Sequence, residues 1–425
     1  MEKLKKQKPS TARSDATAEK QTQLDNIFEQ MGDFGRFQLR VFPLFCLCST
    51  LASLQYASVP FVGYTPEHRC ISPQNDMDGN QTSQIQHFFS DEHRNQSSAC
   101  ESVVNGSREK CHEWEFDRSV MEETYASEFN LVCDEASLVT LMAVIFLVGM
   151  AVGNVGIGLL SDRLGRRTAL GCALLFLSAS GLASTFSPNA VTAILFRFLI
   201  GASSSGAYIT SFLFGMEVVG PKKRMFAGII MHFFYAAGSC GASGIAYALR
   251  HWRYLQAAIT APALLLAVYT WTVPESIRWL LSRGRKEDAK LVAKGVAQQN
   301  GRHIKSYDIF DNLKVDAVPQ KSKGILKELW KTPRLVFHMV LLSLIWGLVE
   351  ATWFGISLNS GNIEGSIFVN YFLVGLIEFP ANCVLFTINR YGRKIPFVLT
   401  MVLCGMLCLS TTFVELYTGE GNFKF

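Results

Sequence analysis

Two short turns decide the fold of this 425-residue chain: residues 158–167 read GLLSDRLGRR, and residues 389–394 read NRYGRK. Each turn follows a long apolar stretch and places basic residues beside a glycine. The matched glycines, Gly165 and Gly392, are 227 residues apart. This spacing is far longer than the unit of a soluble solenoid. Parallel repeats of six membrane spans are instead a transporter architecture, in which substrate binds near the membrane midplane between two halves.

Apolar blocks close to the length of a bilayer span recur along the chain and predict nine transmembrane helices. They lie near residues 41–62, 138–160, 168–187, 190–214, 225–249, 254–273, 335–358, 366–388 and 396–416. Each block can satisfy its backbone hydrogen bonds only as a helix, because the alternation of a closed barrel is absent. The sequence therefore predicts an all-α, polytopic membrane protein. Glycine-rich stretches at 149–158 and 201–206 favour close helix packing.

Composition supports the membrane assignment. Hydrophobic residues make up 49% of the chain and charged residues 18%, and the mean hydropathy is +0.20. Globular chains usually carry about 25% charged residues, so the composition disfavours a soluble enzyme and a disordered chain. The net charge of +5 is small and scattered, which disfavours nucleic-acid binding. The first 36 residues are polar and lack the apolar region of a secretory signal.

Lysine and arginine near the span ends predict a cytoplasmic N-terminus. Segment 275–334 holds 14 Lys or Arg against 7 Asp or Glu, whereas loop 63–137 holds 5 against 15. Arg250 and Arg253 are exceptions, because they fall in a short outer turn. We therefore expect four parts: a cytoplasmic N-terminus (1–36), a six-span bundle (37–274) with extracellular loop 63–137, a cytoplasmic linker (275–334) and a partial C-terminal bundle (335–425).

The long outer loop carries its own chemical signals. It holds three Asn-x-Ser/Thr sequons, which predict glycosylation at Asn80, Asn95 and Asn105. It also holds four of the eleven cysteines: Cys70, Cys100, Cys111 and Cys133. An even set in an oxidising compartment predicts two disulfides, with three pairings open. The alternative is that some of the four remain free thiols.

Several motifs together resemble one transporter family. They are GDFGRFQ (32–38), EFNLVCD (128–134), SDRLGRR (161–167), EVVGPKKR (217–224), PESIRWLL (274–281), SLNSGN (357–362) and EFPA (378–381). Combined with the large cysteine-bearing loop, they resemble the organic cation, anion and zwitterion (carnitine-type) transporters of the major facilitator superfamily. The resemblance runs from about Asp25 to Thr411 and implies alternating access.

Ionisable and aromatic side chains inside spans are the candidate substrate-binding residues. A charge in hydrocarbon is costly, so each is a functional candidate. Trp346, Glu350 and Trp353 share one helix face by spacing. A carboxylate in a water-filled cavity attracts an organic cation, and each aromatic ring adds roughly 0.5–2 kcal/mol. The resemblance implies that Trp346, Trp353, Glu378, His232 and Tyr235 line the central cavity, and Glu350 and His232 depart from the residues of typical cation members.

Structural interpretations stay open for the same residues. Each tryptophan could pack against neighbours or belong to an interfacial belt, and Glu378 could serve the helix break at Pro380. His232 could be satisfied within its own helix. Arg197 fits a structural ion pair as well as a role in coupling.

Charges at the cytoplasmic span ends are a candidate gating network. They are Asp162, Arg163, Arg166, Glu217, Arg224, Glu275 and Arg278. The resemblance implies that such groups pair when the transporter opens outward and separate when it opens inward, which biases a two-state equilibrium. Exposed pairs are individually weak, so a network is needed. Arg167, Lys222 and Lys223 fit a purely topological role.

The sequence indicates a transporter rather than an enzyme. It contains no P-loop, no zinc-spaced Cys/His cluster and no Gly-x-Ser-x-Gly elbow, so we expect no catalytic residue, cofactor or metal. The prediction is a plasma-membrane secondary transporter of small organic cations or carnitine-like zwitterions. A co-transported or exchanged ion and a homo-oligomer are left open, and no nucleic-acid partner is expected.

Two alternative functions remain. One is an organic anion transporter of the same family. The other follows from the repeat, since the partner of the sixth span should end near residue 500, whereas the chain stops at Phe425. Three spans are then missing, and we expect no transport without them. The chain would instead be a truncated isoform or fragment that binds or regulates a full-length partner.

Overall fold

The computed structural model describes residues 25–71, 100–104, 107–307, 310, 332–359, 365–387, 392 and 394–418. All statements about absences below concern these residues. The three predicted glycosylation sites, Asn80, Asn95 and Asn105, lie outside them.

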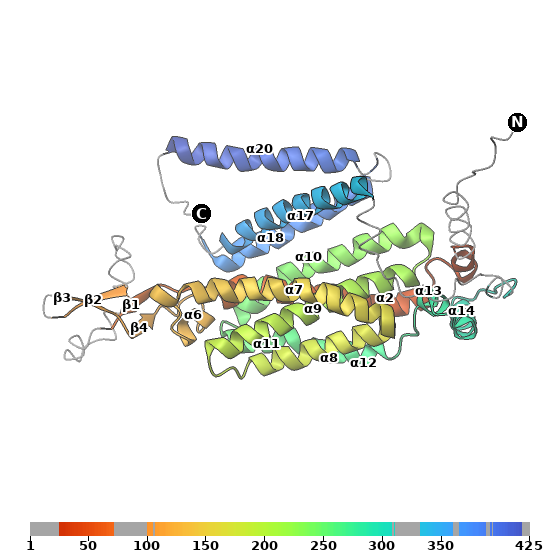
Figure 1. Ribbon diagram of the computed structural model, residues 1–425, viewed down its shortest axis with the longest axis horizontal. Helices are drawn as coiled ribbons and strands as arrows, with labels where there is room; N and C mark the ends of the chain where they lie inside the picture. The colour runs from red at the N-terminus through yellow and green to blue at the C-terminus, as the bar shows by residue number, and fades with distance from the viewer. Residues whose placement is uncertain are drawn as a thin grey trace, which may run out of the picture.

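The apolar blocks form the long helices of the molecule, with ends that agree with the predicted ones within a few residues (Figure 1). The first five blocks form α2 (Arg36–Ala57) with α3 (Val59–Val62), α7 (Ser137–Leu164), α8 (Arg166–Ser184), α9 (Ala190–Val218) and α10 (Arg224–Ala248). The sixth forms α11 (Trp252–Thr260) and α12 (Pro262–Thr270), and the last three form α17 (Pro333–Asn359), α18 (Ile367–Val384) and α20 (Lys394–Thr418).

Seven of these helical segments in the described part of the chain are long and apolar enough to cross a membrane. The sixth block is divided because Pro262 lacks a backbone N–H and restarts the helix at its first turn. The described apolar part of α20 is shorter, at Lys394–Ser410. α17 and α18 run beside the bundle formed by α2 and α7–α12, and α20 lies apart on their far side (Figure 1).

Short strands and helices fill the segments between spans. In the long loop, β1 (His68–Cys70) pairs antiparallel with β4 (Trp114–Phe116), and β2 (Glu101–Val104) pairs with β3 (Ser107–Lys110). They add a small β subdomain to the all-α prediction. The loop also holds α6 (Tyr125–Glu128), and the segment after α12 forms α13 (Ile277–Ser282) and α14 (Lys286–Gln299). Below, the loop end is the end of the bundle that carries residues 64–136, and the turn end is the end that carries residues 162–167.

Glycines allow α7 and α9 to touch along their backbones. A Cβ added to Gly149 would lie 2.2 Å from the Phe198 carbonyl oxygen, and one at Gly153 would lie 2.0 Å from that of Ala202. In the other direction, a Cβ at Gly201 would lie 2.2 Å from the Phe146 oxygen. These are the glycine-rich stretches for which the sequence predicted close packing, and small residues at such an interface let helix backbones approach.

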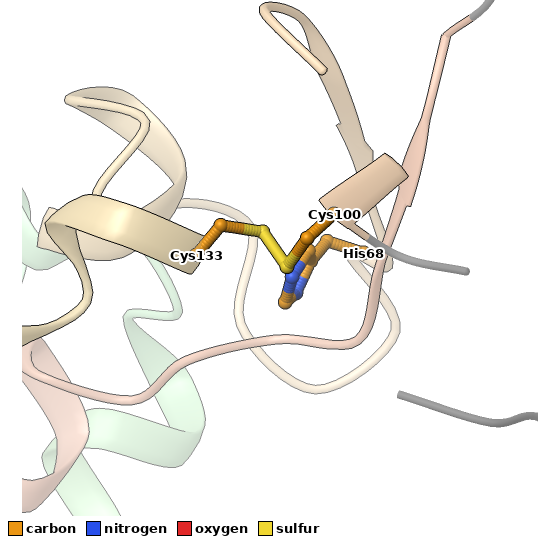
Figure 2. Close-up of side chains that lie close together, drawn as sticks. All are labelled: His68, Cys100 and Cys133. Atoms are coloured by element: carbon orange, nitrogen blue, oxygen red, sulfur yellow. A yellow bond between two sulfur atoms is a disulfide. The ribbon is translucent and has the colours of Figure 1, made fainter. Parts of the chain in front are cut away.

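Two disulfides fasten the loop end. Cys70 pairs with Cys111, and Cys100 pairs with Cys133, which is one of the three pairings that the sequence left open. His68 lies against the second bridge (Figure 2). Its ring nitrogens and the two sulfurs are within 4.8 Å of one another, but sulfurs joined in a disulfide are not the thiolates that bind metals.

The two arginines that broke the charge rule both contact the long loop. Arg253 forms an ion pair with Glu128, and its Nη2 donates to the Ser187 carbonyl at 2.9 Å. The indole N–H of Trp252 donates to the same Glu128 carboxylate at 2.5 Å. Arg250 donates to the Ser119 carbonyl at 3.0 Å. Both arginines therefore hold the loop to the turn between α10 and α11.

A polar contact holds α14 to the start of α2 at the turn end. The amide of Asn300 accepts a hydrogen bond from the Phe37 backbone N–H at 2.9 Å and donates to the Met31 carbonyl at 2.9 Å and to Gln38 at 3.0 Å. A Cβ at Gly35 would lie 2.3 Å from Asn300 Oδ1, so the glycine leaves room for this amide. Part of the predicted linker is thus folded onto the bundle.

Candidate functional site

An aromatic cluster joins the N-terminal bundle to α17. The ring of Tyr56 on α2 lies 4.9 Å from the Trp353 ring and 5.4 Å from the Phe354 ring, both on α17, and 6.5 Å from the Phe146 ring on α7. Tyr56 is only 9% exposed. Aromatic faces carry the negative side of a quadrupole, so such a cluster can attract a cation.

A carboxylate lies beside this cluster, between α10 and α18. Glu378 is half-buried, and its Oε1 accepts a hydrogen bond from the Ser239 hydroxyl at 3.3 Å. The Ser239 hydroxyl in turn lies 3.0 Å from that of Ser53 on α2. Ser53 lies three residues before Tyr56 on α2, so this chain of contacts connects Glu378 to the helix turn that carries Tyr56. A negative charge in a low-dielectric site stabilises a cationic partner far more than the same charge in water.

Tyr235 and His232 lie on α10 next to aromatic residues of α9. The Tyr235 ring is 5.6 Å from that of Tyr208, and the His232 ring is 5.9 Å from that of Phe212. Tyr235 lies four residues, about one helical turn, before Ser239, the residue that donates to Glu378. The His232 carbonyl accepts a hydrogen bond from the Asn382 side chain of α18 at 3.4 Å.

A second aromatic group lies between this site and the loop end. The Phe61 ring of α3 stacks on Phe368 at 5.7 Å and meets Tyr371 edge-on at 5.3 Å, both on α18. Phe61 and Tyr371 are fully buried and Phe368 nearly so. Below, these three residues are called the aromatic seal. The seal joins the N-terminal bundle to α18. It lies between the loop end and the central cluster, by which we mean Tyr56, Phe146, Trp353 and Phe354.

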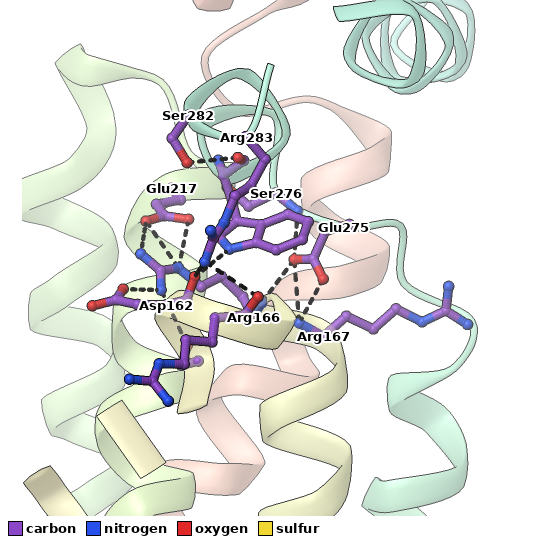
Figure 3. Close-up of polar contacts among 11 residues, drawn as sticks. Asp162, Arg166, Arg167, Glu217, Glu275, Ser276, Ser282 and Arg283 are labelled. Atoms are coloured by element: carbon purple, nitrogen blue, oxygen red, sulfur yellow. Dashed lines mark hydrogen bonds and ion pairs between the residues drawn. The ribbon is translucent and has the colours of Figure 1, made fainter. Parts of the chain in front are cut away.

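At the turn end, Glu275 caps the N-terminus of α8 (Figure 3). Its Oε1 accepts hydrogen bonds from the backbone N–H groups of Arg166, at 2.9 Å, and Arg167, at 3.3 Å. A carboxylate at a helix N-terminus satisfies orphan N–H groups and complements the helix dipole. Gly165 makes this possible, because its φ of +105° suits glycine and an added Cβ would lie 2.2 Å from Glu275 Oε2. The matched Gly392 also has a positive φ, of +74°.

Arg166 and Arg283 make further polar contacts at the same turn (Figure 3). The Arg166 guanidinium pairs with Asp162 at 2.5 Å and with Glu217 of α9 at 3.2 Å. Arg283 donates to the Asp162 carbonyl at 2.5 Å, and the Trp279 indole donates to that carbonyl at 2.9 Å. Unpaired carbonyls at the C-terminus of α7 are thereby satisfied.

A second ion-pair group lies around Asp25. Its Oδ1 accepts from Arg278 at 2.9 Å and from Arg224 at 3.5 Å. Burial lowers the pKa of the Arg278 guanidinium below its usual value, the like charge of Arg224 adds to this, and Asp25 opposes it. Arg163 is exposed. These interactions join the N-terminal bundle to its own flanking segments.

A family model and several known proteins place the chain among transporters. Residues 79–422 match the model of the "Sugar (and other) transporter" family. The chain is 30% identical over 92% of its length to an organic cation transporter protein of Drosophila melanogaster, covering 75% of that protein. It is also 30% identical to solute carrier family 22 member 1 of Oryctolagus cuniculus and to member 3 of Mus musculus, with 92% of this chain and 76% of each relative covered.

The chain belongs to solute carrier family 22, within the major facilitator superfamily. Among solved structures, it is similar to a partially occluded, inward-open xylose transporter XylE from E. coli, with 20% identity, a TM-score of 0.46, and 83% of this chain and 74% of that chain covered. The all-α membrane fold and the transporter class predicted from the sequence are confirmed, and the family is not one of enzymes.

In this solute carrier family 22 member, the six predicted substrate-binding residues do not all meet. Trp353 belongs to the central cluster, and Glu378 and Tyr235 are connected to it through Ser239. His232 instead contacts Phe212 and Asn382. Trp346 is 64% exposed, and Glu350 is exposed. The two tryptophans share a helix face, but they lie two turns apart along α17, and only Trp353 reaches Tyr56.

The predicted role of the seven gating charges, which is to pair when the transporter opens outward and to separate when it opens inward, stays a prediction. Among the described residues, none of the seven pairs with α17, α18 or α20, and the bridges stay between α7, α8, α9, α10 and the segments that flank the bundle. The reason is that the N-terminal segment and residues 275–283 supply nearer partners, of which Asp25 and Arg283 were not predicted.

We expect the variant Glu275→Gln to lower the stability of the folded protein by about 1–2 kcal/mol, because a neutral amide is a weaker helix cap than a carboxylate. The measurement is thermal unfolding of the purified protein, followed by tryptophan fluorescence. Glu113→Gln is the matched control: its exposed side chain lies in the long loop outside any helix, so a change within about 0.5 kcal/mol is expected. Equal shifts for the two variants would contradict the capping role.

Proposed function

We propose that this chain moves small organic cations or carnitine-like zwitterions across the plasma membrane by alternating access. The observation that carries the proposal is the half-buried carboxylate of Glu378 between α10 and α18, which accepts a hydrogen bond from Ser239. Ser239 in turn contacts Ser53, three residues before Tyr56 of the Tyr56–Trp353 ring pair. The relatives that are named organic cation transporters support the same substrate class.

The central cluster supplies two attractions that a quaternary ammonium needs. Its positive charge gains from the Glu378 carboxylate, and its apolar methyl groups gain from the ring faces of Tyr56, Trp353 and Tyr235. Each good cation–π contact contributes about 2 kcal/mol when desolvated. Because Trp353 packs directly on Tyr56, a ligand enters by parting these rings, which come from the two sides of the molecule.

Two features support an alternating-access cycle. The aromatic seal joins the N-terminal bundle to α18 at the loop end, whereas the charges of the turn end pair without α17, α18 or α20 among the described residues. We assign this arrangement to an inward-facing state, in which the route to the loop end is closed. Opening outward then requires the seal to part, and the charges of the turn end become available to new partners.

The driving force follows from the charge of the substrate. A cation entering a cell gains about 2.3 kcal/mol per 100 mV of membrane potential. A zwitterion carries no net charge, so it needs a co-transported or exchanged ion.

The test is uptake into proteoliposomes that hold the purified 425-residue chain, with an imposed potential and three radiolabelled probes: tetraethylammonium, carnitine and an aromatic monocarboxylate. We expect accumulation of the first or second probe above protein-free liposomes, with tetraethylammonium uptake rising with inside-negative potential. Uptake of the carboxylate alone would replace the proposal by the organic anion alternative. Saturable binding without uptake would favour the non-transporting alternative, and neither binding nor uptake would overturn the proposed site.

A further inference from the structure

A buried arginine at the loop end has no partner for its charge. Arg197 of α9 is 2% exposed, and neither Nη1 nor Nη2 makes a hydrogen bond to any described residue. Arginine stays protonated in proteins. A buried charge without a partner is strongly destabilising, and in a membrane-spanning helix the cost of desolvation is greater still. The positive charge of Arg197 therefore needs an anion that the described residues do not supply.

The groups around Arg197 do not neutralise it. The guanidinium carbon lies 5.1 Å from the centre of the Tyr125 ring and 5.9 Å from that of Phe146, so its nearest neighbours are ring faces. The Tyr125 hydroxyl is buried beside the guanidinium, and a neutral phenol supplies no negative charge. The nearby carboxylate of Glu128 is occupied by Arg253 and by the Trp252 indole. Ring faces offset part of a cation's desolvation but supply no negative charge.

Arg197 and Tyr125 both line one pocket, with a volume of about 350 Å³. The pocket lies between α3, α6, α7, α9 and the first residue of α18. Its other lining residues include Tyr64, Val139, Thr140 and Ile367, and none of the described residues that line it is acidic. Both side chains can donate hydrogen bonds to a ligand: the guanidinium through two N–H₂ groups, and the phenol through its O–H. Donors of this kind in a partly apolar pocket fit a small anion.

We propose that this pocket binds a small monovalent anion, which is the counter-ion of Arg197. Its chemistry is shared by an inorganic halide and by the carboxylate of a small solute, since either accepts hydrogen bonds from the guanidinium and the phenol. The site is distinct from the central cluster, because its ligand is negative and its charged residue is Arg197 rather than Glu378. The two regions touch through Phe146, whose ring contacts both Arg197 and Tyr56.

The experiment is thermal unfolding of the purified full chain in lipid nanodiscs, followed by tryptophan fluorescence. Sodium gluconate is replaced stepwise by sodium chloride, or by sodium acetate, at constant ionic strength. We expect a saturable rise in the unfolding temperature with at least one of the two anions. A response to chloride alone assigns the site to an inorganic halide, and a response to acetate alone assigns it to carboxylates. No response to either anion overturns the proposal, since water would then be enough to solvate the Arg197 guanidinium.

Variants test whether the anion-dependent rise in unfolding temperature requires Arg197. Arg197→Gln is expected to raise the midpoint anion concentration at least about tenfold, because it removes a charge-assisted hydrogen bond. Arg250→Gln is the control: it removes the same charge at the same end, outside the pocket, and is expected to keep the midpoint. If Arg197→Gln does not fold, Thr140→Phe fills the pocket from an exposed position and is expected to abolish the response. A response that survives in either pocket variant overturns the proposal.

Discussion

Glu378→Gln is expected to lower the uptake of a quaternary ammonium substrate by about tenfold or more, mainly through a higher KM. The substitution keeps the shape of the side chain and its hydrogen bond from Ser239 but removes the negative charge. A hydrogen bond or contact to a charged group contributes about 1.5–3 kcal/mol, and each 1.4 kcal/mol is about tenfold in affinity. The measurement is initial-rate uptake, normalised to the amount of protein in the membrane.

Glu350→Gln is the matched comparison. It makes the same chemical change on α17, where the carboxylate is exposed, so we expect a smaller rise in KM than for Glu378→Gln. Unchanged kinetics for Glu378→Gln, at equal protein in the membrane, would assign Glu378 to the helix break at Pro380 rather than to the substrate. A lower protein level without a change in KM would lead to the same conclusion.

Gly153→Ala is expected to have the largest effect on stability. The added methyl group would lie 2.0 Å from the Ala202 carbonyl oxygen, which belongs to the backbone of α9 and cannot rotate away. The two helices must therefore move apart, and the contacts at Gly149 and Gly201 are lost with them. Overpacking typically costs about 1–3 kcal/mol, and more where backbones collide, so we expect about 3 kcal/mol or a failure to fold.

Gly156→Ala supplies the control on the same helix. Nothing lies within 4 Å of a Cβ at this position, and alanine is a better helix former than glycine by about 1 kcal/mol. Its stability should be equal or higher. Both variants are compared by thermal unfolding and by the amount of folded protein recovered from membranes. If Gly153→Ala unfolds at the same temperature as Gly156→Ala, the close contact of α7 with α9 is not needed for the fold.

Most of the fold could be predicted from the sequence, because hydropathy and backbone hydrogen bonding leave a membrane chain few options. The helix α7 was expected over residues 138–160, and it spans Ser137–Leu164. Loop structure was harder. The strands of the long loop are only three or four residues long, too short for a periodic signal. Helix α14 was not predicted, although its buried residues Ala289, Ala293, Val296 and Ala297 recur at helical spacing. Its contact with the N-terminal segment is what periodicity does not reveal.

The candidate site was predictable only where a residue was unusual for its position. Glu378 and Trp353 stood out because a carboxylate and an indole are rare inside a span. Tyr56 and Ser239 did not stand out, since a single tyrosine or serine in a span is ordinary, and their importance comes from contacts across helices. The charges at the turn end were recognised, but their partners were not. A charge pattern gives the sign and the side of the membrane, whereas a partner such as Asp25 depends on tertiary structure.

The cap on α8 has a consequence for the order in which the protein is made. The Glu275 carboxylate that holds the N–H of Arg166 is 109 residues further along the chain, and the Trp279 and Arg283 groups on the Asp162 carbonyl come later still. During synthesis, α7 and α8 therefore enter the membrane with their connecting turn unsatisfied. That turn becomes fixed only after the chain has passed through α12. The hairpin formed by the second and third spans, α7 and α8, is therefore secured only once the sixth span is in place.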